Sequence, residues 1–149
     1  MGLDQYAYVA ARAGVYEEHD AAIDLLEESD IEGDARVEAE SEIAAMQPRE
    51  IAYWRKHPNL HGWMEALWAE RNPDFYEQGG TFNGIELELT WEDLERLEQD
   101  VLAGTLPVTT GFFFGNAADD HYRDYDLQFI RNAKAEVFVG LKVFYNSSW

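Results

Sequence analysis

The sequence contains no cysteine, only three lysines and no run of 18 apolar residues. Without cysteine the chain cannot form disulfides, thiolate nucleophiles or cysteine-based zinc or iron–sulfur sites. The lack of a long apolar run argues against a membrane span. The opening Met1-Gly2-Leu3-Asp4 does not have the basic and apolar segments of a signal peptide. We therefore expect a protein of a reducing, intracellular compartment.

Positive charge is scarce: 30 acidic residues face 11 Lys and Arg, for a formal net charge of −19. The acidity is concentrated in residues 17–42, where twelve carboxylates stand against one cation, Arg36, a net charge of −11. Such a field repels nucleic acid and acidic lipid, so we expect no direct binding to either. Three interpretations stay open: a solvated surface, a halophilic source, or a surface that imitates DNA.

The composition is otherwise that of a folded chain. With 149 residues, 46% hydrophobic and 14% aromatic, it is long enough for a single domain, 1–149, around one core. Residues 3–10 predict a first strand, with Tyr6 and Tyr8 on one face and Ala7 and Val9 on the other. Two weak helical patterns follow in the acidic stretch, separated near Gly33. We interpret residues 17–47 as an acidic helical arm or insertion.

The next segment predicts two helices on either side of Pro58. Pro48 suits a first helical turn, with Ile51 and Trp54 on the buried side, and Pro58 stops this helix near His57. Asn59 is expected to cap the second helix. That helix carries the clearest apolar stripe of the chain: Leu60, Trp63, Met64, Leu67 and Trp68. Residues 73–84 are expected to form a loop.

The remaining residues alternate between strand and helix patterns. A strand is expected around residues 85–89, then a helix that begins with a capping box of Thr90 and Asp93 and ends at Gly104. Residues 108–114 predict a buried strand, residues 119–140 a helix and residues 141–145 a last strand. The short connections predict an α+β fold: a small, mainly antiparallel sheet with helices packed on one face.

Several of these segments are similar to known sequences. The motif YWRKHPNLHGWM at residues 53–64, Leu106-Pro107, GFFFG at residues 111–115 and the segment 119–122 together resemble a family of small uncharacterised bacteriophage proteins. The resemblance implies a virus-encoded accessory protein in the host cytoplasm, with interference with host defence as one role that the viral setting suggests. It implies no mechanism, and the acidic segment 17–47 lies outside it.

Residues 53–63 are the most distinctive candidate site, because cations, histidines and aromatics gather there in an otherwise acidic chain. Arginine offers a planar fork for phosphate, lysine a point charge and tryptophan a stacking face. We predict a non-enzymatic site for an anionic, nucleotide-like small molecule, or for a host protein. Its residues would be Trp54, Arg55, Lys56, His57, Asn59, His61, Asn116, His121 and Arg123. The alternative is that the tryptophans belong to the core and the cations are solvated.

Two further function classes remain. One is a DNA mimic that uses residues 17–42 to block a host DNA-binding protein. The other is a metal-dependent hydrolase built on His57, His61 and His121. Pro58 separates the first two histidines and no serine elbow is present, so an enzyme is the less favoured class. We expect no cofactor and no bound metal, and the sequence does not define the oligomeric state.

Overall fold

The computed structural model describes residues 2–110 and 119–149. In chain order its elements are β1 (Asp4–Ala10), α1 (Val15–Glu27), α2 (Asp34–Met46), β2 (Arg49–Arg55), α3 (Pro58–Arg71), α4 (Pro73–Glu77), β3 (Leu87–Leu89), α5 (Trp91–Ala103), α6 (Asp119–Phe138) and β4 (Lys142–Ser148). Within the described residues, no helix combines the length and the apolar character that crossing a membrane requires.

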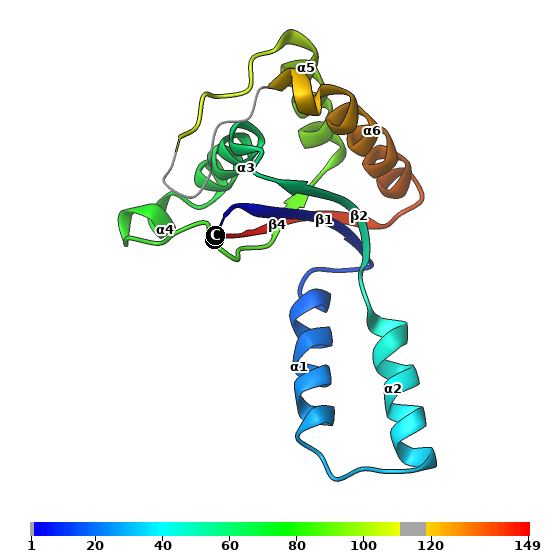
Figure 1. The fold of residues 1–149 in the computed structure, drawn as a ribbon. Coiled ribbons are helices and arrows are strands. Elements are labelled where there is room, and N and C mark those ends of the chain that lie inside the picture. Colours follow the sequence, from blue (N-terminus) through cyan, green and yellow to red (C-terminus); the bar gives the residue numbers. More distant parts are fainter. Residues whose placement is uncertain (1, 111–118) are drawn as a thin grey trace.

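The four strands form one antiparallel sheet in the order β2-β1-β4-β3 (Figure 1). The two faces of β1 differ as the alternation predicts: Ala7 and Val9 enter the main core, whereas Tyr8 packs on the opposite face with Phe144 and Val15. Helices α3, α5 and α6 lie together on the core face. The predicted α+β fold is confirmed.

The apolar stripes of the three covering helices form the core. In α3, Leu60, Trp63, Met64 and Leu67 are buried as the 3.6-residue period predicts. In α5 the capping box is present, because the Thr90 side chain accepts from the Asp93 N–H and the Asp93 carboxylate accepts from the Thr90 N–H. Gly104 ends this helix at φ 68°, a left-handed conformation that glycine adopts without steric cost.

The segment after Pro48 is a strand, so the helix predicted there was wrong. Strand β2 pairs with β1 along its length, and its inward side chains, Ala52 and Trp54, alternate with exposed Tyr53 and Arg55. Ile51 and Trp54, three residues apart, share a face of a helix but not of a regular strand. The register with β1 shifts at Ile51, which pairs with no residue of β1 and still packs against the core. The Asn59 cap was also wrong: His57 is the N-cap and Pro58 the first helical residue.

Two other expectations need correction. The predicted loop 73–84 begins with a short helix, α4, whose first residue is Pro73. The predicted strand at 108–114 is not formed at Val108, which is 89% exposed and belongs to no strand of the sheet. Residues 111–114 of that prediction, and the whole GFFFG motif at 111–115, lie outside the described residues.

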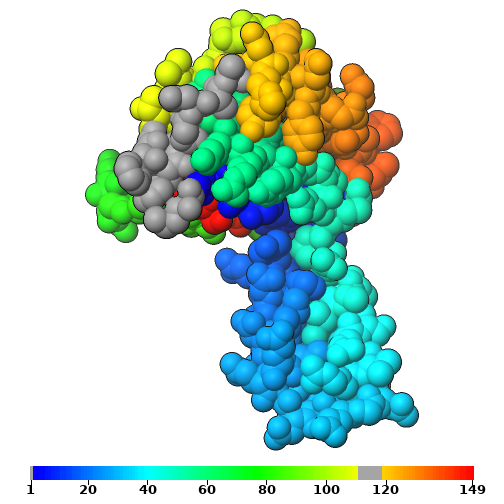
Figure 2. Space-filling view, in the orientation of Figure 1, coloured from blue at the N-terminus to red at the C-terminus, as the bar shows by residue number. Residues whose placement is uncertain are grey.

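Helices α1 and α2 form a hairpin between the end of β1 and the start of β2, here called the acidic arm (residues 15–46). The arm extends away from the sheet on the side opposite α3, α5 and α6 (Figures 1 and 2). All twelve carboxylates of residues 17–42 are exposed. Apolar packing is thin: α2 buries no residue, and Leu25 and Val37 are 70% and 65% exposed.

Candidate functional site

The cationic and aromatic residues of the predicted site separate into a buried and an exposed group. Trp54, His57 and His61 are buried, with 1%, 0% and 0% exposure. Arg55 and Lys56 are exposed, and Arg55 forms an ion pair with Asp4 at 3.4 Å. The strand period explains the division between Trp54 and Arg55, because successive side chains of β2 point to opposite faces. The structure thus matches the alternative in which tryptophan is core and the cations are solvated.

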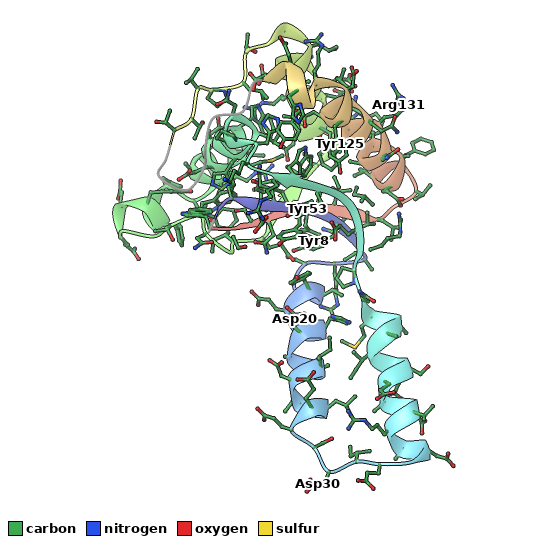
Figure 3. The ribbon with its side chains drawn as sticks, in the orientation of Figure 1. Tyr8, Asp20, Asp30, Tyr53, Tyr125 and Arg131 are labelled. Carbon is green, nitrogen blue, oxygen red and sulfur yellow. The ribbon has the colours of Figure 1, made fainter. Side chains whose placement is uncertain are left out.

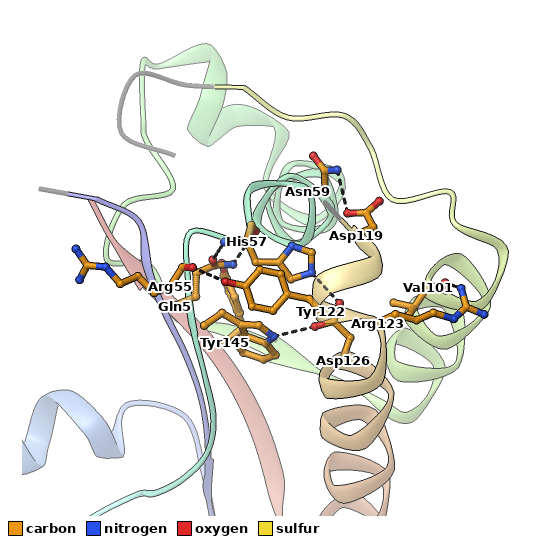
Figure 4. A network of polar contacts seen from close by, with 11 residues as sticks. Gln5, Arg55, His57, Asn59, Val101, Asp119, Tyr122, Arg123, Asp126 and Tyr145 are labelled. Atoms are coloured by element: carbon orange, nitrogen blue, oxygen red, sulfur yellow. Dashed lines mark hydrogen bonds and ion pairs between the residues drawn. The ribbon is translucent and has the colours of Figure 1, made fainter. Parts of the chain in front are cut away.

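A buried carboxylate on α6 holds two of these side chains. Asp126, 1% exposed, accepts from Trp54 Nε1 at 2.8 Å and from His57 Nε2 at 2.7 Å (Figure 4). The His57 ring stacks on Tyr122 with centroids 4.3 Å apart. His57 Nδ1 has no hydrogen-bond partner in the described part of the chain. The neutral tautomer with its proton on Nε2 satisfies this arrangement. The network ties β2 and α3 to α6.

Asp126 was not among the predicted site residues, although the sequence carries a signal for it. It follows Tyr122 by four residues and precedes Phe129 by three. It therefore interrupts the apolar stripe of α6 with a charge. A carboxylate at such a position must find donors, since an unpaired buried charge is very costly. Which donors it finds depends on how β2 packs against α6.

A second polar chain links β1, β4 and α3. The Gln5 side-chain amide forms two hydrogen bonds with the backbone of His57. Its Oε1 accepts from the His57 N–H at 2.8 Å, and its Nε2 donates to the His57 carbonyl at 3.1 Å. Gln5 Nε2 also donates to the Tyr145 hydroxyl at 3.0 Å, and that oxygen lies 2.8 Å from His61 Nδ1. The Tyr145 hydroxyl can accept from Gln5 and also either donate to Nδ1 or accept from it, so the direction of this last bond depends on the His61 tautomer.

Stability should fall as acid protonates His61. Burial lowers the pKa of His61 to about 4, whereas an unfolded histidine titrates near 6.5. Between these values the unfolded chain binds the extra proton, so the His61 contribution is complete above pH ~6.5 and is lost as the pH falls towards 4. The full loss is on the order of 3 kcal/mol. Urea unfolding of wild type and His61→Gln from pH 7.5 to 4.5 measures it.

Because carboxylates titrate in the same range, the informative quantity is the difference between the two proteins. We expect the stability advantage of wild type over His61→Gln to shrink below pH ~6.5. Two curves that stay parallel over this range would contradict a buried, neutral His61.

The remaining predicted residues have structural roles or lie apart. Asn59 donates to Asp119 Oδ1 at 3.0 Å and accepts from the Thr109 N–H at 2.9 Å. Arg123 donates to the carbonyls of Val101 and Leu102, both at 3.0 Å, at the end of α5. His121 is exposed, and Asn116 lies outside the described residues. In the described part of the chain, the hydrogen bonds of Asn59 and Arg123 thus go to Asp119, Thr109, Val101 and Leu102 rather than toward Arg55 and Lys56.

Metal binding has no geometric support either. In residues 2–110 and 119–149, no three His, Asp or Glu side chains are grouped so that they could hold a metal ion. His57 and His61 are each engaged in separate hydrogen-bonded networks, and His121 is on the surface. The spacing of His57 and His61 suggested a ligand pair, but the helix begins between them and their rings point to different partners.

A hollow with aromatic and acidic walls lies where the arm leaves the sheet. Two adjoining cavities of about 320 and 230 Å³ share Tyr6, Tyr8, Tyr16 and Asp20 in their walls. Glu17 lines the first cavity, and Glu50 and His19 line the second. Neither lining includes Lys or Arg. Figure 3 shows Tyr8 on the sheet and Asp20 on α1, on either side of the junction between the arm and the sheet.

The fold and this geometry describe a small α+β body with an acidic, projecting arm. No protein-family model, curated protein or solved structure matches the chain. Its function is therefore inferred from its own charges, contacts and cavities.

Proposed function

We propose that the protein is a non-enzymatic binding protein whose acidic arm occupies the nucleic-acid-binding surface of a basic host protein. The observation that carries the proposal is the exposure of all twelve carboxylates of residues 17–42, nine on the two helices that extend from the body and three in the connection between them (Figures 1 and 2). A surface that binds nucleic acid is cationic, and the arm offers it the charge it recognises.

The carboxylates follow the helices in rows. On α1 they recur at intervals of three and four residues, and on α2 at intervals of four; the two rows are Glu17, Asp20, Asp24 and Glu27, and Asp34, Glu38 and Glu42. At 1.5 Å per residue these steps are about 4.5–6 Å along the axis, the same order as the ~3.4 Å axial step of phosphates along one DNA strand. Each helix is about 20 Å long.

The arm gains little stability from this charge. Carboxylates four residues apart, such as Glu38 and Glu42, repel each other along the helix. The only cation of residues 17–42, Arg36, pairs with Glu40 at 3.0 Å. Leu25 and Val37 remain largely exposed beside the acids. A basic partner would relieve the repulsion and could also cover these apolar side chains.

The anionic small molecule predicted from the sequence has less support, because Arg55 and Lys56 are not joined by the other predicted ligands. The resemblance to bacteriophage proteins fits a virus-encoded accessory protein that acts on a host protein in the host cytoplasm. Interference with host defence is one purpose such binding would serve.

The test removes charge from the distal end of the arm. The variant Glu27→Gln/Glu28→Gln/Asp30→Asn/Glu32→Gln and wild type are measured against purified bacterial nucleic-acid-binding proteins with basic surfaces. We expect wild type to bind at least one, to weaken as salt rises and to be displaced by duplex DNA. The variant should bind at least ~10-fold more weakly, as expected from the loss of four charges facing a cationic surface.

A matched control removes four exposed carboxylates from the body: Asp74→Asn/Glu77→Gln/Glu92→Gln/Asp124→Asn. It has the same net charge as the arm variant, and it should bind nearly as well as wild type. Equal weakening by both variants would show a non-specific charge effect, and an absence of binding across the panel would refute the proposal.

A further inference from the structure

The two cavities between the arm and the sheet have aromatic walls. Tyr8 and Tyr16 face each other with ring centroids 5.1 Å apart, and Tyr8 stacks on Phe144 at 5.7 Å. Tyr6 packs against Tyr53 at 5.3 Å. Tyr16 comes from α1 and the other two tyrosines of the walls, Tyr6 and Tyr8, come from β1, so the walls exist only where the arm meets the sheet. Flat aromatic faces at a cavity are suited to a planar or cationic group.

Carboxylates complete the same walls. Glu17, Asp20 and Glu50 line the cavities and are exposed. In the described part of the chain none of them forms an ion pair with Lys or Arg; Asp20 has only His19 Nδ1, at 3.7 Å. These carboxylates also affect a neighbouring tyrosine. The pKa of Tyr16 is raised mainly by burial and further by the negative charge of Asp20. Negative charge without a counter-ion beside aromatic rings favours a cation.

The cavity is held open by contacts at the base of the arm. Tyr8 donates its hydroxyl proton to Glu86 Oε2 at 2.5 Å, and Glu86 Oε1 accepts from the Gly14 N–H at 3.0 Å. Gly14 has a φ of 83°, which glycine tolerates better than other residues. One carboxylate thus joins the sheet to the first residue before α1. The spacing of Tyr8 and Tyr16 is set before any partner binds.

We propose that this junction is an arginine pocket: the guanidinium of an arginine on the partner protein enters the cavities beside Tyr16 and Tyr6 and pairs with Asp20 and Glu17 or Glu50. Arginine fits better than lysine, because its planar guanidinium stacks on aromatic faces and its fork matches a carboxylate. The proposal rests on the proposed function, since it names a side chain by which a basic partner is recognised.

The pocket can be tested without knowing the partner. The probe is N-acetyl-arginine amide at millimolar concentrations, and the readout is the NMR shift of the tyrosine ring signals of the full chain. We expect shifts concentrated at Tyr6, Tyr8 and Tyr16. The Asp20→Asn variant should weaken the apparent affinity several-fold, and Tyr16→Leu should do the same while keeping an apolar side chain there.

The matched control is Asp24→Asn, which removes the same charge one turn further along α1 and should leave the affinity within about twofold of wild type. N-acetyl-citrulline amide, an uncharged analogue, should give no comparable shifts. The proposal is overturned if citrulline amide binds as well, if Asp24→Asn and Asp20→Asn weaken binding equally, or if the tyrosine signals do not move. Equal binding by N-acetyl-lysine amide would overturn the choice of arginine.

The two proposals can fail separately. Suppose that a basic protein binds the arm, and that Asp20→Asn changes neither this binding nor the binding of N-acetyl-arginine amide. The arginine pocket then fails and the proposed function stands. If arginine amide binds at the tyrosines but no basic protein binds the arm, the proposed function fails and the pocket stands.

Discussion

Replacing Asp126 by alanine is expected to destabilise the protein by about 3–5 kcal/mol, the range for removing one member of a buried hydrogen-bonded pair. The carboxylate is 1% exposed and accepts from both Trp54 and His57. Without it, two buried N–H donors lose their partners, and each loss costs about 1–3 kcal/mol. The change also leaves space beside the Trp54 and Phe129 rings, whose centroids are 5.0 Å apart.

Urea unfolding followed by tryptophan fluorescence would measure the effect. Asp124→Ala is the control, because Asp124 is exposed on the same helix, two residues earlier, and its loss should change stability by less than about 0.5 kcal/mol. Asp126→Asn should lie between the two, since an amide oxygen can still accept from one donor. If Asp126→Ala and Asp124→Ala prove equally stable, the buried network contributes nothing.

The second large effect is expected on removal of the whole arm. Strands β1 and β2 are hydrogen-bonded neighbours, with Val9 opposite Arg49. Replacing residues 11–47 by Asn-Gly would join them through a two-residue turn of the kind that favours hairpins. The main core contains no residue of the arm. The shortened protein should therefore fold cooperatively and lose all detectable binding to a basic partner.

A moderate cost to stability is expected from the other face of the sheet. Tyr8 and Phe144, 2% and 1% exposed, pack with Val15 on the first turn of α1 and would become solvent-accessible. Their partial exposure should lower the free energy of unfolding by about 1–3 kcal/mol. Thermal unfolding followed by circular dichroism tests the fold. A broad, non-cooperative transition would show that the arm is needed by the body, and unchanged binding would place the partner site elsewhere.

Local patterns were most informative where one face of a long element meets the core. The stripe of α3, the capping box of Thr90 and Asp93, and the alternation of β1 all depend on neighbours within a few residues, and all were predicted. The segment after Pro48 was not, since the spacing of Ile51 and Trp54 favours a helix, and the strand depends on pairing with β1 and on the register shift at Ile51. Trp54, Arg55 and His57 accordingly changed role, from members of one candidate site to a core side chain, a surface cation and a buried histidine.

The charge of the arm was determined by sequence alone, because the number of carboxylates and their helical spacing require no tertiary contact. The same holds for the lack of cysteine ligands and of an apolar span. Only the tertiary structure decided that Arg55 and Lys56 lie on the surface while Trp54, His57 and His61 are buried, that Asp126 accepts from both Trp54 and His57, and that Tyr8 and Tyr16 face each other. Each of these arrangements joins residues from elements that are far apart in the chain. How close their side chains come in space is set by the packing of helices and strands, which no local sequence pattern contains.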